Sequence, residues 1–418
     1  MMSKKTIISA IKSKDGKTLL SNFMWLSALQ VVSYVFPILT LPYLARVIGV
    51  DSFGEIAFAG SIIAFLMTIV TYGFNLTAVR DIAKSRNDIY CVSKIFSNVI
   101  TTSFMLMMVS AFILGVCIYT IPFLRERQLL LWITFLSIPG YIMFPEWFFQ
   151  AMEKMKYVTI MNVSSKLIFT ILVFIIIREK NDYIYQPLLG ALGYLVGGVI
   201  SLWLIFKKFR VKYIMPTPSE IWCMIKDGWN LFLSLILPNL YNNFSIVLLR
   251  SYYNAGTVGI YTSGYKFIDL FDQVSNVLSR VFYPFLSRRL DKHSLYVRIS
   301  GFISISASLI LFFGADLLIK IFYTTEFAAS ATIIRVMSIC PIFIFLMNAF
   351  GTNYLVVIKE ETIYRNIILY CSIFGFLISW AFVVLWGAMG MSLTIVLVWG
   401  IRGVLTWYFA YKLKKAHK

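Results

Sequence analysis

Twelve runs of mostly apolar residues, each about 20 residues long or longer, follow one another along this chain of 418 residues. A helix needs about 20 such residues to cross the hydrocarbon core of a bilayer. Hydrophobic residues make up 59% of the chain and charged residues only 14%, whereas soluble proteins carry about 25% charged residues. The sequence therefore predicts an all-α integral membrane protein with twelve transmembrane helices, covering roughly 21–45, 55–77, 95–121, 128–150, 157–177, 185–206, 229–249, 257–285, 297–320, 332–357, 363–386 and 390–411.

Lysine and arginine are concentrated on one side of this expected topology. Of the 38 basic residues, 26 fall in the N-terminal segment, the even-numbered loops and the C-terminal tail, 8 fall in or beside the odd-numbered loops, and 4 lie inside runs. Cytoplasmic loops are enriched in basic residues, so we expect a multi-pass protein of the cytoplasmic membrane with both termini in the cytoplasm. This distribution also accounts for the net charge of +19 without nucleic acid as a partner.

The two halves of the chain show a weak internal repeat. Trp25 and Arg46 are 21 residues apart, as are Trp229 and Arg250, and the two pairs are offset by 204 residues. Repeats of six spans are typical of transporters, whose substrate site lies between the repeats. We therefore expect two six-helix lobes around a central cavity, with the chain divided into a cytoplasmic N-terminal segment (1–18), an N-lobe (19–206), a cytoplasmic linker (207–228), a C-lobe (229–411) and a cytoplasmic tail (412–418).

The eighth run carries the strongest indication of a binding site. Five of its polar residues recur at a spacing that places them on one face of a helix: Lys266, Asp269, Gln273, Asn276 and Arg280. Asp272 lies at the edge of this face. An ionisable group inside a bilayer costs at least about 2.5–3.5 kcal/mol, so such groups face a polar cavity or one another. One interpretation is a cavity that binds substrate. The alternative is a self-satisfied pair of Lys266 and Asp269, with the remaining ends extended to the membrane surface.

Further polar residues lie inside or at the ends of other runs. Lys166 is a cation in the fifth run, and its amine either faces a cavity or extends to the cytoplasmic surface. Arg46, Arg250 and Arg80 end runs, where they form a gate or rim or anchor helices at the membrane surface. The first and seventh runs carry the amide and phenol groups of Gln30, Tyr34, Asn239 and Asn242. These groups can form hydrogen bonds to the hydroxyls of a sugar or, equally well, to neighbouring helices.

Groups that support enzymatic catalysis are not evident in the sequence. The two histidines, His293 and His417, lie in a loop and in the tail, and the five cysteines are typical of small core residues. No joining segment is long enough for a folded domain with catalytic groups. We expect neither a catalytic residue nor a metal site nor a cofactor, and hence a transporter rather than an enzyme.

Three segments of the first half carry recognisable motifs: 41–49 (LPYLARVIG), 72–83 (YGFNLTAVRDIA) and 145–155 (PEWFFQAMEKM). They resemble the bacterial O-antigen flippases, which belong to the multidrug, oligosaccharidyl-lipid and polysaccharide exporter superfamily. The second half is similar in layout and only loosely in motif, around residues 259–261. The resemblance implies a flippase that carries undecaprenyl-diphosphate-linked polysaccharide repeat units from the cytoplasmic to the periplasmic leaflet of the inner membrane.

The expected mechanism and partners follow from this resemblance together with the charged residues. Cations at Lys166, Lys266 and Arg280 would bind the diphosphate, while the lobes alternate between inward- and outward-open states. The expected partners are the lipid-linked oligosaccharide, membrane lipids, H⁺ or Na⁺ at Asp269 and Asp272, and the polysaccharide polymerase machinery. The alternatives are an ion-coupled exporter of another substrate on the same scaffold, and a polytopic glycan polymerase or glycosyltransferase.

Overall fold

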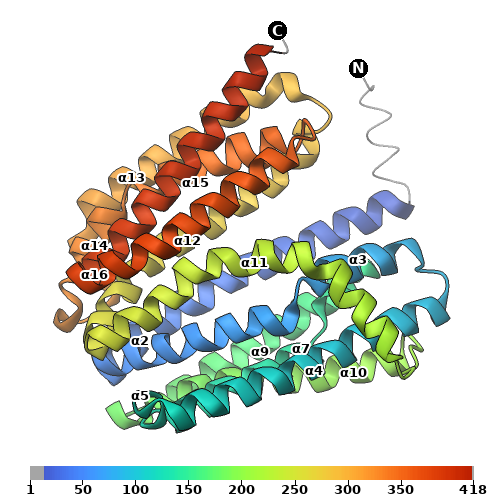
Figure 1. The fold of residues 1–418 in the computed structure, drawn as a ribbon, viewed down its shortest axis with the longest axis horizontal. Helices are drawn as coiled ribbons and strands as arrows, with labels where there is room; N and C mark the ends of the chain where they lie inside the picture. The colour runs from blue at the N-terminus through green and yellow to red at the C-terminus, as the bar shows by residue number, and fades with distance from the viewer. Residues whose placement is uncertain (1–13, 417–418) are drawn as a thin grey trace. The chain divides into compact units, whose positions relative to one another are not determined.

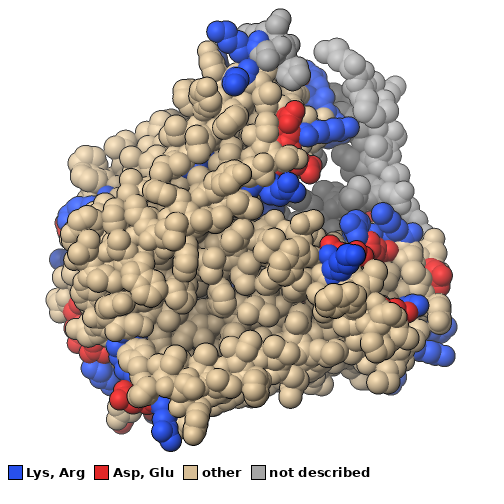
Figure 2. Space-filling model, in the orientation of Figure 1, with Lys and Arg blue, Asp and Glu red and all other residues tan. Residues whose placement is uncertain are grey.

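The computed structural model describes residues 14–416, and helices form almost all of this part of the chain. These residues contain no β-strand, and the expected all-α class is confirmed. On the face drawn in Figure 2, uncharged side chains cover most of the surface and charged side chains lie mainly toward its borders. Such a surface suits a protein whose helices are surrounded by lipid.

Two long helices each contain a sharp turn at a glycine. α2 (Lys14–Thr71) covers the first two expected spans, and α16 (Glu361–Ala416) covers the last two. Gly49, with a φ of 73°, and Gly387, with a φ of 55°, interrupt the helical geometry in a left-handed region that favours glycine. Each pair of spans is therefore joined almost without a loop.

The number of membrane-spanning helices fits the expected twelve. Within residues 14–416, nine helical segments are long and apolar enough to cross a membrane, and one of them, Glu361–Lys415, contains two expected spans. α12 (Ala255–Leu286) is not among the nine, because Lys266, Asp269 and Asp272 interrupt its apolar surface. Its 32 residues are nevertheless long enough to cross a bilayer.

The contacts divide the chain into two compact units (Figure 1). Unit 1 contains the described residues up to Tyr43 together with Leu66–Phe232. Besides the first part of α2, its helices are α3 (Phe74–Lys84), α4 (Ile89–Thr120), α5 (Pro122–Arg125), α6 (Gln128–Phe135), α7 (Ser137–Met143), α8 (Glu146–Ala151), α9 (Met155–Ile176), η1 (Lys180–Ile184), α10 (Tyr185–Lys207) and the first part of α11 (Pro218–Tyr252).

Aromatic side chains form much of the core of unit 1 around α8. Phe148 and Phe149 are fully buried, and their rings lie edge to face with centroids 5.6 Å apart. Phe96 of α4 and Phe209, which follows α10, meet the Phe148 ring at 5.7 and 5.3 Å. Edge-to-face pairs add to the stabilisation from packing, so this cluster fixes the position of α8 and of Glu146 at its start.

Unit 2 contains Leu44–Phe65 and the residues from Leu233 onward. The segment Leu44–Phe65 belongs to α2, so this helix contributes to both units. The other helices of unit 2 are the second part of α11, α12, η2 (Leu290–Lys292), α13 (His293–Phe322), η3 (Thr325–Phe327), α14 (Ser330–Met337), α15 (Cys340–Leu346), the π-helix η4 (Met347–Leu355) and α16.

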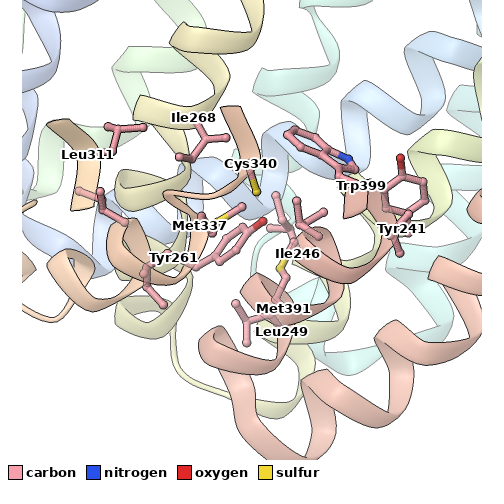
Figure 3. Close-up of a cluster of buried hydrophobic side chains, with 14 of the residues drawn as sticks. Tyr241, Ile246, Leu249, Tyr261, Ile268, Leu311, Met337, Cys340, Met391 and Trp399 are labelled. Carbon is pink, nitrogen blue, oxygen red and sulfur yellow. The ribbon is translucent and has the colours of Figure 1, made fainter. Parts of the chain in front are cut away.

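The core of unit 2 is made by side chains from several of these helices (Figure 3). Tyr261, Met337 and Met391, from α12, α14 and α16, are buried in one cluster. The two segments of α16 pack closely on each other at Gly375, where an added Cβ atom would lie 2.8 Å from Cγ2 of Val398. α12 also packs against α16, and these two helices carry Asp272 and Arg402.

Replacing Phe148 by alanine tests the aromatic core of unit 1. We expect Phe148→Ala to destabilise the protein by about 3 kcal/mol, because it leaves a cavity beside four other aromatic rings. Phe112→Ala is the matched control, since the Phe112 side chain is 73% exposed. Thermal unfolding in detergent measures the difference, and equal melting temperatures for the two variants would contradict the role of the cluster.

Candidate functional site

α12 presents the predicted polar face, and its first residues satisfy one another. The Nζ of Lys266 lies 3.5 Å from Oδ2 of Asp269, and the side-chain amide of Gln273 donates a hydrogen bond to the same oxygen at 3.0 Å. The side chains of Lys266 and Asp269 are 38% and 31% exposed. The local pair is therefore present, and both of its members remain accessible to a ligand.

Asp272 lies among a different set of groups. The side-chain amide of Asn348 donates to Oδ1 of Asn276 at 3.2 Å, so the NH₂ group of Asn276 is left for Asp272, with which it interacts. Asp269 on the same helix repels Asp272, and Arg402 on α16 attracts it. Asp272 therefore lies between a negative and a positive group inside unit 2.

The π-helix η4 supplies two buried amides to α12. The amide of Asn348 donates to Oγ of Ser275 at 3.0 Å, and the amide of Asn353 donates to Oγ of Ser279 at 2.6 Å. All four residues are buried. π-helices are rare and occur frequently at functional sites. These contacts could not be predicted from the sequence, because a π-helix departs from the 3.6-residue period by which polar faces are recognised.

Arg402 is a charged residue of unit 2 that belongs to no predicted polar face. Its Nη2 donates to the hydroxyl of Tyr364 at 3.3 Å, and the guanidinium lies 5.8 Å from the centre of that ring. Its Nε is buried and has no hydrogen-bond partner among the residues that the structure describes. Arg402 stands alone in its run, so the one signal in the sequence was its charge inside a membrane span.

Arg280 and Lys266 lie far apart on α12. Fourteen residues separate them, which corresponds to about 21 Å along a helix axis. Arg280 is exposed, and within the described chain it forms no ion pair. One diphosphate group spans only a few ångströms, so the two cations cannot hold it at the same time.

Lys166 of α9 has an acidic neighbour in unit 1. Glu146, at the start of α8, and Lys166 attract each other electrostatically. The side-chain amide of Asn162, one helical turn before Lys166, donates to Oε1 of Glu146 at 2.7 Å. Glu146 lies in the motif 145–155, but its proximity to Lys166 could not be predicted from the sequence. The two residues are 20 positions apart, and only the turn between α8 and α9 brings them together.

The amides of α11 are satisfied within that helix to different degrees. The side chain of Asn243 donates to Oδ1 of Asn239 at 2.5 Å, and Asn239 donates to the carbonyl of Leu235 at 3.0 Å. Oδ1 of Asn242 is buried and has no partner in the described part of the chain. The side chains of the two expected polar residues of α2, Gln30 and Tyr34, lie outside the described residues.

The three arginines expected at a gate or rim have different surroundings. Arg250 forms an ion pair with Glu55 at 2.6 Å, and their side chains are only 11% and 16% exposed. Arg80 pairs with Asp81 at 2.8 Å on an exposed surface. Arg46 is also exposed. Of the three, Arg250 is the one held in a buried contact.

Two glycines allow a close backbone contact beside this ion pair in unit 2. A Cβ atom on Gly54 would lie 1.8 Å from the carbonyl oxygen of Ala255, and one on Gly259 would lie 2.2 Å from that of Val50. Any other residue at these positions would force the two backbones apart. We call the contact of residues 50–55 with residues 250–259 the glycine clasp.

The family of the chain follows from comparison with known proteins. The model of the family described as "Polysaccharide biosynthesis protein" matches residues 19–290, well over half of the chain. The chain belongs to this family. It is a membrane transporter, and the expected resemblance to the O-antigen flippases is confirmed.

Two relatives of this transporter bear the name "Putative O-antigen transporter". The one from Escherichia coli (strain K12) is 25% identical over 386 residues, covering 90% of this chain and 92% of its own length. The one from Shigella dysenteriae is 26% identical over 384 residues, covering 90% of this chain and 95% of its own length. Each is therefore similar to the transporter over nearly its whole length.

Two solved structures of membrane proteins have a similar fold. An inward-facing multidrug resistance transporter of the MATE family matches with a TM-score of 0.66 at 13% identity, over 93% of this chain and 98% of its own. The lipid II flippase MurJ in an inward-closed conformation matches with a TM-score of 0.63 at 15% identity, over 90% of this chain and 87% of its own. Identities this low show the shared fold alone.

Reversing the charges of Arg250 and Glu55 tests the ion pair of the glycine clasp. Either Arg250→Glu or Glu55→Arg alone should destabilise the protein by about 3–5 kcal/mol, because each leaves two like charges in a mostly buried place. The double variant restores opposite charges, so we expect it to recover most of the lost stability in a thermal unfolding assay. Asp81→Arg, at the exposed pair with Arg80, serves as a control with an expected effect below about 1 kcal/mol. Simple additivity of the two single effects would contradict the pairing.

Proposed function

We propose that this transporter is a flippase that moves undecaprenyl-diphosphate-linked polysaccharide repeat units from the cytoplasmic to the periplasmic leaflet of a bacterial inner membrane, with both termini in the cytoplasm. The observation that carries the proposal is the set of cationic side chains inside membrane helices of a protein of this family. Lys166, Lys266 and Arg402 all lie within expected spans. The names of the two O-antigen transporter relatives support the same cargo.

The physical requirement for such a cargo is a replacement for water around its phosphates. A diphosphate cannot cross hydrocarbon unaided, because losing its hydration is very unfavourable. A lysine amine that already faces a carboxylate can exchange that partner for a phosphoryl oxygen without leaving a bare charge. Lys266 with Asp269 and Lys166 with Glu146 have this arrangement. Arg280, about 21 Å along α12 from Lys266, would meet the diphosphate at another stage of its passage.

The sugars of the cargo require weaker contacts than the diphosphate. Amide and hydroxyl groups form hydrogen bonds to sugar hydroxyls that break readily on release. We assign this role to Gln30, Tyr34, Asn239, Asn242, Gln273 and Asn276.

Transport by alternating access requires contacts that open and close. We assign the glycine clasp to a gate on the periplasmic side, since the first and seventh spans end there in the topology with cytoplasmic termini. Arg250 and Glu55 would hold it shut by charge, while the two glycines permit backbone contact. Arg46 and Arg80, both exposed, fit a role at the membrane surface.

An ion-coupled exporter of another substrate is the second candidate, because the MATE transporter of similar fold is a multidrug resistance protein. A cargo that is cationic or uncharged would gain nothing from Lys266. The side chains that face the cargo therefore separate the two candidates, whereas the fold does not.

Complementation of a flippase-deficient strain tests the cargo and the role of Lys266. Lys266→Ala should lower surface polysaccharide about tenfold at matched expression, because one charge-assisted contact to phosphate is lost. Lipid-linked repeat units should then accumulate in the cytoplasmic leaflet. Lys292→Ala is the matched control, since Lys292 ends the short helix η2 and its side chain is 52% exposed. Failure of the wild-type protein to complement would exclude this cargo, and full recovery by Lys266→Ala would exclude Lys266.

The driving force can be tested at Asp269 and Asp272. A negative cell interior favours outward movement of an anion by about 2.3 kcal/mol per charge per 100 mV, so potential alone could drive transport. If the aspartates bind H⁺ or Na⁺, the variant Asp269→Asn/Asp272→Asn should lose its response to an imposed ion gradient in proteoliposomes and keep its response to potential. Asp291→Asn is the control, because Asp291 is an exposed residue of the short helix η2. An unchanged response to the gradient would show that these residues do not couple transport to ions.

A further inference from the structure

Arg402 has an unusual position inside unit 2. A guanidinium stays charged in proteins and offers five N–H donors. Within the described chain it donates one hydrogen bond, from Nη2 to the hydroxyl of Tyr364, and its buried Nε has no partner. Leaving a buried charge this poorly satisfied is strongly unfavourable, and charged residues inside spans usually serve a function.

The surroundings of Arg402 leave its positive charge without an anion in direct contact. Tyr364 and Cys371 of α16 and Tyr241 of α11 are uncharged neighbours. The one carboxylate that acts on Arg402 is Asp272 of α12, and among the described ion pairs none joins the two. The positive charge of Arg402 is therefore only partly balanced by the protein.

The shape of the guanidinium indicates which anion would complete this site. Its parallel N–H groups match two oxygens of a phosphoryl group, which a lysine amine cannot do. The hydroxyl of Tyr364, already 3.3 Å from Nη2, lies where it can donate to a third oxygen. The residue as a whole is partly buried.

We propose that Arg402 binds a phosphoryl group of the cargo in the interior of unit 2, with Tyr364 as a second donor. This assignment rests on the proposed function, in which the cargo carries a diphosphate. When no cargo is bound, the negative charge of Asp272 attracts Arg402. When cargo binds, the phosphoryl group takes the place of Asp272. Competition by Asp272 limits the affinity, which a transporter needs in order to release its cargo.

Binding of two probes to the purified full-length protein in detergent tests the assignment. The probes are inorganic pyrophosphate and farnesyl diphosphate, which share the diphosphate and differ in the lipid. Arg402→Gln should weaken the binding of both at least tenfold, and Arg402→Lys, which keeps the charge and loses the fork, should have an intermediate effect. Arg365→Gln is the control, because Arg365 is an exposed arginine on the same helix. Wild-type affinity in Arg402→Gln would overturn the proposal, and binding of pyrophosphate without farnesyl diphosphate would overturn a lipid-linked cargo at this site.

A second pair of variants separates binding from a purely structural role. If Arg402 only balances the charge of Asp272, then the double variant Arg402→Gln/Asp272→Asn should bind both probes as the wild type does, and this result would refute the proposal. If Arg402 is a ligand, the double variant stays at least tenfold weaker, while Asp272→Asn alone binds at least as tightly as the wild type. Failure of the wild-type protein to flip lipid-linked sugars, with intact Arg402-dependent binding of pyrophosphate, would contradict the proposed function and not the anion site.

Discussion

The free-energy penalty for placing charge inside a membrane governs the arrangement of this protein. Each charged side chain within the spans of α9, α12 and α16 lies near a charge of opposite sign or a polar group, apart from the exposed Arg280. The partners come from neighbouring helices or from one turn away on the same helix. The positions of α8, α12 and α16 therefore decide which charges lie near one another. The aromatic and apolar cores hold these helices in place.

The fold class and the approximate ends of the spans could be predicted from the sequence, because hydrophobic length and loop charge are local properties. The pair of Lys266 and Asp269 was equally accessible, since both residues lie one turn apart on one helix. Glu146 beside Lys166 and Arg402 beside Asp272 were not, because each pair joins two helices. The π-helix η4 also escaped prediction, because its hydrogen-bond pattern depends on its neighbours and has no period of its own in the sequence.

The similar structures show that the fold alone does not determine the cargo of such a protein. A multidrug transporter and a lipid II flippase share this fold at 13% and 15% identity, so the scaffold accommodates cargoes of different chemistry. What separates such proteins is the set of groups turned toward the cargo. In the proposed function those groups would include Lys266, whose carboxylate partner Asp269 a phosphate would displace, and this suits a cargo that must be bound and then released.

The turn at Gly387 has a consequence for how the protein is made. With a single residue interrupting α16, the segments before and after it have no spare chain between them. We expect the last two helices to enter the membrane together as a hairpin, because a turn of one residue leaves no hydrophilic loop between them.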